Sequence, residues 1–344
     1  MQAVILTAGK STRTYPLTLT RPKPLLKAAN KTLLEHNFEN LMDFIDEIIL
    51  IVGYKKAQII NIFGSSYNNY PIEYVEQKKQ LGTAHALSLA ERYIDDRFIL
   101  LMGDDIYLKE DIKNCLNYEY SILTTRVKNP QNFGVIIENN GIVADFIEKP
   151  KNFVSNLVST AFYTLDKGIF SHIKNIKKSK RNELELPDAI KLMAKEEKIY
   201  CVKSKGWLPI VYAWDLLSVD RVLRKNKTII GNNSKIYGYV KNSCIGNNCI
   251  IHGSIKNSIV MDNTTIGEGS IVEDSVIGEN VYFKGKIIAK DNAFSEIKNK
   301  KIKVNRLGAI IADNVSAKDV TINAGCKVWP NKIISNRTIE RDLK

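Results

Sequence analysis

Residues 3–24 read AVILTAGKSTRTYPLTLTRPKP, and this stretch decides the fold. It begins with a short apolar, β-branched run, which is typical of a buried first strand. The run ends at Gly9 in a loop of small and basic residues, and Arg21 and Lys23 follow. Backbone N–H groups and fixed positive charge at the end of a strand form a place where polyphosphate binds. The alternative is an ordinary strand–turn with solvated bases. The spacing does not fit a loop ending in Gly-Lys-Ser/Thr, which excludes the usual ATPase motif.

Strand-like and helix-like segments alternate from residue 1 to about residue 223. Continuous apolar strands separated by helices predict a parallel sheet covered on both faces. Ligands bind at the carboxyl ends of such strands, so the loops after Ala8, Gln77 and Gly103 should converge. Two antiparallel pieces follow at 134–150 and 157–165, and the sequence NNG in the first predicts a hairpin turn. The expected strands lie at 3–8, 47–54, 72–77, 98–104 and 120–127, and the expected helices lie near 32–43, 56–63 and 83–92.

The pattern changes after about residue 227, where an aliphatic residue followed by glycine recurs. These steps begin at Ile230, Ile245, Ile266 and Ile277. Apolar residues recur six apart, which is typical of a hexapeptide β-helix whose coils must stack to be stable. Residues 291–304 interrupt the repeat and residues 308–328 resume it. We therefore expect two domains, 1–226 and 227–344.

Composition narrows the class of protein. The chain has 344 residues, of which 44% are hydrophobic and 25% charged, as in globular proteins. No apolar run reaches the roughly 20 residues that span a membrane, and no signal peptide is visible, so we expect a cytoplasmic protein. We expect the five cysteines to be reduced core residues. The net charge of +13 is scattered among acids, which argues against nucleic acid as the main partner. Bases are locally dense only in KNIKKSKR (174–181), which we expect to be a solvated loop. Abundant Lys, Glu and Ile suggest a heat-adapted source.

Two further segments carry chemistry. In QKKQLGTAHA (77–86), Gln77 ends a strand and Gly82-Thr83 opens a helix, which lets backbone groups meet the edge of a base. The alternative is a helix capped by Thr83. In LLMGDDIY (100–107), Asp104 comes just after a buried strand, where it suits a Mg²⁺ ion that bridges phosphate oxygens. The alternative is a simple cap.

These segments resemble the sugar-1-phosphate nucleotidylyltransferases, in particular the archaeal bifunctional members with a C-terminal acetyltransferase domain. The first stretch matches the signature of that family at Gly9, Thr12, Arg13, Pro16, Leu17, Thr18, Pro22, Lys23 and Pro24. The resemblance implies a Rossmann-like α/β domain with a mixed sheet, followed by a short, irregular left-handed parallel β-helix. It also implies that UTP or dTTP is bound by Leu6, Ala8, Gly9, Gln77, Gln80, Gly82 and Thr83. Gln77 would pair with the base, and Gly82 would leave room for it.

The resemblance extends to a sugar-binding half. It implies that Gly134, Glu148, Lys149 and Ser159 bind the sugar 1-phosphate, which would be glucose 1-phosphate or N-acetylglucosamine 1-phosphate. The implied reaction gives an NDP-sugar and pyrophosphate. Arg13, Lys23 and Asp104 would be catalytic, and Asp104 would hold Mg²⁺ as the cofactor.

The sequence departs from the family pattern at several positions. Ser11 stands where glycine is common, Ser159 where asparagine is usual, and Pro209 where many relatives have a second metal-binding aspartate. A catalytically silent paralogue that senses ligands or assembles subunits is therefore the alternative function. In the C-terminal domain, Glu268 stands where the acetyltransferase histidine would be, so we do not expect acetyl transfer. We expect a homo-oligomer, either a trimer or a dimer.

Overall fold

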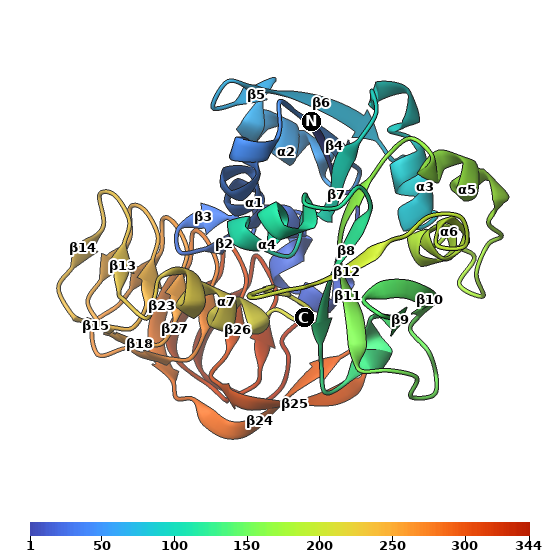
Figure 1. Ribbon diagram of the computed structural model, residues 1–344. Coiled ribbons are helices and arrows are strands. Elements are labelled where there is room, and N and C mark those ends of the chain that lie inside the picture. Colours follow the sequence, from blue (N-terminus) through green and yellow to red (C-terminus); the bar gives the residue numbers. More distant parts are fainter. The chain divides into compact units, whose positions relative to one another are not determined.

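The computed structural model describes residues 1–344 and divides the chain into two compact units (Figure 1). The first unit contains Met1–Gly9 and Leu34–Leu208, and the second contains Lys10–Leu33 and Pro209–Lys344. The segment that follows Gly9 is therefore grouped with the C-terminal part of the chain. The domain boundary expected between residues 226 and 227 remains a prediction.

The first unit is built on a ten-stranded mixed sheet, as expected for the α/β class. Strands β6, β4, β1 and β7 are parallel, and Leu6 at the end of β1 lies opposite Ile51 and Met102. Beyond β7, β11 runs antiparallel to both β7 and β8. In spatial order the strands are β5 (Ser66–Tyr67), β6 (Tyr70–Glu76), β4 (Glu47–Val52), β1 (Gln2–Leu6), β7 (Phe98–Met102), β11 (Leu157–Leu165), β8 (Ser121–Arg126), β12 (Tyr200–Lys203), β10 (Ile142–Glu148) and β9 (Gly134–Asn139).

Six helices cover the two faces of this sheet. Figure 1 shows α3, α5 and α6 on one face and α1, α2 and α4 on the other. The central strands are fully buried between these layers, as the sequence predicts for a sheet covered on both sides. The helices are α1 (Leu33–Leu41), α2 (Lys56–Phe63), α3 (Thr83–Ser88), α4 (Lys109–Cys115), α5 (Ile169–Asn175) and α6 (Leu186–Met193), with short 3₁₀ turns at η4 (Met42–Phe44), η5 (Glu91–Tyr93) and η6 (Pro130–Asn132).

The predicted hairpin is confirmed as β9–β10. Asn140 and Gly141 form its turn, with φ angles of 50° and 76°. Both lie in the left-handed region that a two-residue type I′ turn requires, which Asn-Gly adopts at little cost. The hairpin places Gly134 directly opposite Glu148.

The second unit contains a parallel β-helix, as expected. One sheet contains β13 (Ile229–Ile230), β16 (Cys244–Ile245), β19 (Ile259–Val260), β22 (Val276–Ile277), β26 (Ile310–Ile311) and β28 (Lys327–Val328). The other contains β14 (Lys235–Ile236), β17 (Ile250–Ile251), β20 (Thr265–Ile266), β23 (Tyr282–Ile287), β21 (Ile271–Glu273), β18 (Ser254–Lys256) and β15 (Tyr239–Lys241), with β27 (Ser316–Ile322) and β29 (Ile333–Ile339) joined through β23. Outside the coils lie β2 (Lys27–Ala28), β3 (Lys31–Thr32), α7 (Asp215–Leu223) and the turns η1 (Thr12–Thr14), η2 (Leu17–Leu19) and η3 (Lys23–Leu25).

Inward-facing aliphatic side chains hold the coils together. Ile245, Val260, Ile277 and Ile311 stack along one face and are at most 1% exposed. Equivalent asparagines with left-handed φ angles turn the chain at one corner, and their amides bond from coil to coil over 15 or 17 residues. The coils are thus shorter than the about 18 residues of three complete hexapeptides. The left-handed winding remains a prediction.

The expected interruption of the repeat is a hairpin. Strands β24 (Lys290–Ile297) and β25 (Lys300–Leu307) pair antiparallel and leave the coils as a long arm (Figure 1). Lys327, only 2% exposed, ties this arm to the C-terminal segment, because its Nζ lies 3.1 Å from Ser295 Oγ and 2.8 Å from Asp342 Oδ2.

Two expectations about the whole chain can be checked directly. No helix is long and apolar enough to cross a membrane. All five cysteines are free, and four of them are buried. Burial raises the pKa of Cys115 to about 12 and that of Cys326 to about 11, so these thiols are protonated at neutral pH.

Candidate active site

Three of the predicted loops lie at one edge of the sheet in the first unit. Since β1, β6 and β7 are parallel neighbours or near neighbours, their carboxyl ends share this edge. The Gly103 amide donates to the Leu6 carbonyl at 3.0 Å, which places Asp104 beside the loop after β1. The Gln80 side-chain amide donates to the Ala8 carbonyl at 2.8 Å. The structure thus brings together the first-unit parts of the predicted nucleotide site.

The segment after β6 is held by its own side chains. The buried Gln77 amide donates to the Gly82 carbonyl at 3.2 Å and lies 3.0 Å from His85 Nδ1. Burial lowers the pKa of His85, which favours the neutral ring that can accept this hydrogen bond. The pairing of Gln77 with a base, which the resemblance implies, would require exchange of these internal partners.

Gly82 is required by the fold of this segment. Its φ of 110° is a conformation that other residues rarely adopt, and a Cβ there would lie 2.3 Å from the Leu184 carbonyl oxygen. Thr83 does not cap α3, because its hydroxyl accepts a hydrogen bond from the Leu186 amide at 3.0 Å. The loop therefore packs directly against the start of α6.

The turn after β7 carries two carboxylates with different surroundings. Asp105 accepts a hydrogen bond from Trp207 Nε1 at 3.2 Å, while Asp104 is partly exposed. The buried Tyr107 hydroxyl donates to the Thr160 carbonyl at 2.8 Å and ties this turn to β11. Burial, followed by the charges of Asp105 and Asp104, raises the pKa of Tyr107 well above 10. The phenol is therefore a fixed hydrogen-bond donor.

Of the predicted sugar-binding residues, Gly134, Glu148 and Ser159 lie on β9, β10 and β11, and Lys149 directly follows β10. A Cβ on Gly134 would lie 2.5 Å from Phe146 Cε2, so only glycine fits opposite the end of β10. Glu148 Oε1 lies 2.7 Å from Lys149 Nζ. Ser159 is buried, and its hydroxyl lies 3.2 Å from the Tyr163 hydroxyl.

The register of β11 relates the predicted sugar-binding residues to the first-unit residues of the predicted nucleotide site. Tyr163 of β11 lies opposite Leu100 of β7, and the strands are antiparallel. The residues before Tyr163, including Ser159, therefore extend past the carboxyl end of β7, where Asp104 lies. Both sets share one edge of the sheet.

Arg181 is a residue of this region that the sequence analysis did not identify. Its Nη2 lies 3.3 Å from Glu148 Oε1 and 2.7 Å from Glu185 Oε1. It belongs to the basic run 174–181, which reads as a solvated loop in the sequence. The three glutamates around Arg181, at positions 148, 183 and 185, could not be identified without the tertiary structure.

The second unit contains Arg13 and Lys23. Arg13 is exposed and Lys23 is 5% exposed, and both lie close enough to Asp215 for their charges to lower its pKa. Burial is the larger effect and raises the pKa of Asp215 above 3.8 overall. The structure thus brings the two predicted cations near one carboxylate, which accepts hydrogen bonds from the amides of Val211 and Tyr212 at 2.9 and 2.8 Å. Asp215 was also missed from the sequence.

The position of the second metal-binding aspartate offers no ligand. Pro209 directly follows Leu208, whose amide and carbonyl pair with Ile106. No group of three His, Cys, Asp or Glu side chains forms a metal site in the structure. Mg²⁺ characteristically binds one or two carboxylates together with substrate phosphates and water, and Asp104 fits that role.

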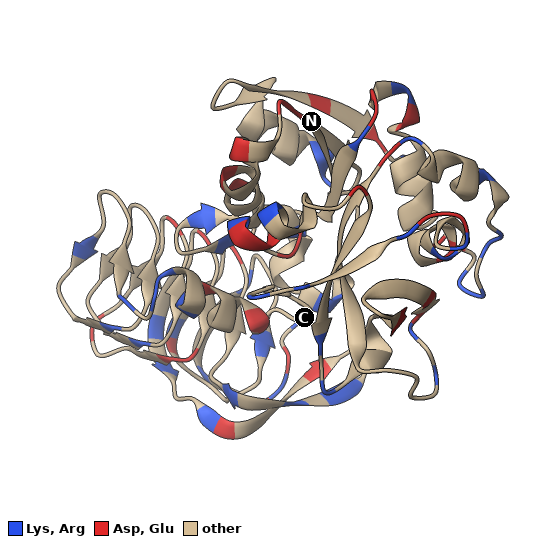
Figure 2. Cartoon of the chain, viewed as in Figure 1, with Lys and Arg blue, Asp and Glu red and all other residues tan.

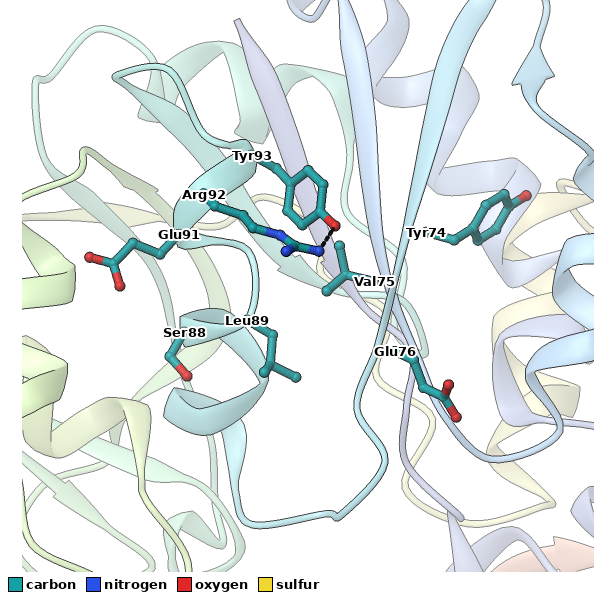
Figure 3. Close-up of a pocket in the computed structure, with 8 residues that line it drawn as sticks. All are labelled: Tyr74, Val75, Glu76, Ser88, Leu89, Glu91, Arg92 and Tyr93. Atoms are coloured by element: carbon teal, nitrogen blue, oxygen red, sulfur yellow. Dashed lines mark hydrogen bonds between the residues drawn. The ribbon is translucent and has the colours of Figure 1, made fainter.

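A cavity of about 610 Å³ lies elsewhere in the first unit, between β6 and the segment from α3 to η5 (Figure 3). Figure 3 shows the hydrogen bond between the Arg92 guanidinium and the Tyr93 hydroxyl. The Arg92 Cζ also lies over the Tyr93 ring, 4.6 Å from its centroid. None of the lining residues is a predicted site residue. The distribution of charged residues along the chain indicates no further site, because basic and acidic residues are interspersed within each unit (Figure 2).

The family described as "Nucleotidyl transferase" matches residues 2–224, and the family described as "GMPPB C-terminal domain" matches residues 218–343. The bifunctional protein GlmU of Methanococcus vannielii is 36% identical, over 100% of this chain and 96% of its own length. The UTP–glucose-1-phosphate uridylyltransferase AglF of Haloferax volcanii is 34% identical, over 66% of this chain and 98% of its own length.

A solved structure shares the fold of the first part of the chain. It is the crystal structure of a protein from Bacillus anthracis assigned as a glucose-1-phosphate thymidylyltransferase, in complex with sucrose. The match has a TM-score of 0.59 and 27% sequence identity, and it covers 65% of this chain and 96% of that one.

Proposed function

Because this chain belongs to the nucleotidyl transferase family, we propose that it transfers a nucleotidyl group from UTP or dTTP to a sugar 1-phosphate. The observation that carries the proposal is the shared sheet edge in the first unit. The loop after β1, the Gln77–Thr83 segment and Asp104 lie there, beside the residues of β9, β10 and β11. An enzyme that joins two phosphate-bearing substrates needs both at one place.

The reaction we propose is attack of a sugar 1-phosphate oxygen on the α-phosphorus of the nucleotide. A new phosphorus–oxygen bond forms, the bond to the bridging oxygen breaks, and pyrophosphate leaves. Both reactants are anionic, so alignment and charge neutralisation supply most of the rate. In this proposal Arg13 and Lys23 stabilise the charge of the triphosphate, and Lys149 holds the attacking phosphate.

The remaining residues orient the substrates. The triphosphate would lie along Leu6, Ala8 and Gly9 at the end of β1, where Gln80 of the segment after β6 binds the Ala8 carbonyl. Gln77, Gly82 and Thr83 would contact the base. Gly134, Glu148 and Ser159 would bind the sugar. Asp104 would hold Mg²⁺, which would neutralise phosphate charge when bound.

The names of two similar proteins favour particular nucleotides and sugar phosphates as substrates. AglF is named for UTP and glucose 1-phosphate, and the Bacillus anthracis protein for thymidylyl transfer. We therefore propose a pyrimidine nucleotide, with glucose 1-phosphate or N-acetylglucosamine 1-phosphate as acceptor. GlmU relatives are named as bifunctional, but this chain has a single histidine in its β-helix, His252, which is exposed and stacks on Tyr237 at 4.8 Å. We propose that it does not transfer acetyl groups.

A pyrophosphate-release assay tests this proposal. The purified chain is incubated with MgCl₂, each sugar phosphate, and UTP, dTTP, GTP or ATP in turn. We expect release with UTP or dTTP that depends on both the sugar phosphate and Mg²⁺. Nucleotide binding without release under every combination would favour the silent paralogue. Acetyl-CoA consumption with glucosamine 1-phosphate would contradict the proposal for the β-helix.

A further inference from the structure

The segment that carries Arg13 and Lys23 is bound to the β-helix by a cluster of ion pairs within the second unit. Arg21 Nη1 lies 2.5 Å from Glu279 Oε1, and its Nη2 lies 2.6 Å from Asp313 Oδ2. The Thr20 hydroxyl donates to the same Asp313 oxygen at 2.5 Å, and Lys27 Nζ lies 2.5 Å from Asp262 Oδ2. The Arg21 side chain is 12% exposed, so it is largely withdrawn from water.

The three acids occupy equivalent positions in three adjacent coils. Each follows by two residues a paired inward residue, namely Val260, Ile277 and Ile311 of β19, β22 and β26. Each is followed by an asparagine with a left-handed φ. We call Asp262, Glu279 and Asp313 the acidic column. The Glu279 amide donates to Asp313 Oδ1 at 2.8 Å, so neighbouring coils fix the carboxylates as well.

Like charges stacked on adjacent coils repel one another, and partly buried carboxylates lose hydration. The two cations of the N-terminal segment compensate both effects. A guanidinium suits this place because its planar fork can bind two carboxylates at once, which an ammonium cannot do with the same geometry. Burial lowers the pKa of Arg21, but the hydrogen bonds and charges of Glu279 and Asp313 raise it overall. Glu279 and Asp313 together therefore stabilise the charged guanidinium of Arg21 at this position.

Fixing Arg21 in place also restrains the two predicted catalytic cations, Arg13 and Lys23. Arg21 is separated from Lys23 only by Pro22, and Pro24 follows, so few backbone torsions are free between them. On the other side, the hydroxyls of Thr14 and Thr18 both donate to the Ser11 carbonyl, at 2.7 and 3.0 Å. These bonds close the turn that contains Arg13.

We infer that the acidic column is a positioning element for nucleotidyl transfer: it holds Arg21 and thereby sets the places of Arg13 and Lys23. This inference rests on the proposed function. It gives the β-helix a role in the reaction without acetyl transfer and without a residue that touches substrate. A displacement of about 1 Å in a group that stabilises the transition state costs on the order of 10²-fold in rate.

Charge-neutral variants test the inference. We expect Asp313→Asn and Arg21→Gln each to lower kcat for pyrophosphate release about 10- to 100-fold. The KM for the sugar phosphate should change less than about twofold, because its binding residues lie on β9–β11. Arg21→Lys should recover part of the rate. The matched control is Asp319→Asn, which removes an exposed pair with Lys284 at 3.6 Å in the same unit and should leave kcat unchanged.

A second measurement separates this inference from the proposed function. Without substrates, the amides of residues 12–26 should exchange hydrogen faster in Asp313→Asn than in Asp319→Asn. Faster exchange with unchanged kcat would overturn the positioning role, and so would unchanged exchange. If the parent chain releases no pyrophosphate, the proposed function fails. In that case, unchanged hydrogen exchange in Asp313→Asn is by itself enough to show that Asp313 does not anchor residues 12–26. If a single variant does not fold, the triple variant Arg21→Met, Glu279→Gln, Asp313→Asn replaces it, because it leaves no unpaired buried charge in this pair of coils. Its kcat and its hydrogen exchange over residues 12–26 are then interpreted in the same way.

Discussion

Replacement of Arg224 by methionine probes the junction between α7 and the first coil of the β-helix. Arg224 Nε donates to Asp220 Oδ2 at 2.6 Å, and both side chains are 1% exposed. The two other guanidinium nitrogens donate to the carbonyls of Lys227 and Asn242, each at 2.6 Å. Asp220 also accepts a hydrogen bond from the Ala29 amide at 2.9 Å. One buried ion pair thus joins four segments of the second unit.

The loss of stability expected for Arg224→Met depends on the buried groups that lose their partners. Methionine keeps much of the apolar stem of Arg224 but leaves the Asp220 carboxylate buried without its counter-ion. Removing one partner of a buried pair costs about 3–5 kcal/mol in free energy of unfolding. Asp220→Asn should cost less, about 1–3 kcal/mol, because the asparagine oxygen can still accept a hydrogen bond and Arg224 keeps its two carbonyl partners.

Urea denaturation followed by tryptophan fluorescence measures this difference, because Trp214, one of the three tryptophans, stacks on Tyr212 beside α7. The control is Lys284→Met, which breaks an exposed pair and should change the free energy of unfolding by no more than about 1 kcal/mol. A loss below about 1 kcal/mol for Arg224→Met would refute the reasoning. So would a loss for Asp220→Asn that exceeds the loss for Arg224→Met.

Three further predictions concern the site and its loop. Arg13→Ala and Asp104→Ala should each lower turnover about 10²-fold in the pyrophosphate assay, and near-normal rates in both would exclude the roles proposed for them. Ser11 has a φ of 49°, so Ser11→Gly should be tolerated while Ser11→Val should cost about 1–2 kcal/mol relative to glycine, as measured by thermal unfolding. Burial raises the pKa of Asp215 above 3.8, so its ionised form opposes folding at neutral pH. Asp215→Asn, whose oxygen can accept the same two amides, should therefore raise the melting temperature at pH 7. That gain should shrink as the pH falls toward 3.8, and a gain that grows instead would show that the sign is wrong.

The parts of the fold that depend on local pattern could be predicted from the sequence. Apolar strands separated by helices fixed the parallel centre of the sheet, and Asn140-Gly141 fixed the β9–β10 turn. Since parallel strands end at one edge, the convergence of the loops after Ala8, Gln77 and Gly103 followed from the topology alone. The roles of the individual site residues remain predictions.

The parts that depend on distant contacts could not be predicted in this way. The Thr20–Asp313 hydrogen bond joins residues 293 positions apart, and no periodicity in either segment indicates it. Arg181 likewise reads as one more base in a solvated run until Glu148, 33 residues away, is placed beside it. In both cases the partner is a charged residue, and charge complementarity becomes visible only after the backbone has brought the two segments together.

The acidic column shows how such a contact could be anticipated in a β-helix. The six-residue pattern reports only the inward aliphatic positions, because these alone are needed to stack the coils. Outward corner positions are free to vary, and like charges repeated there lower stability. Aligning the chain on the left-handed asparagines at 263, 280 and 314 puts an acid immediately before each one. Three such acids in adjacent coils repel one another and destabilise the β-helix, so they indicate a cationic partner outside the coils. In this chain Lys27 and Arg21 are that partner.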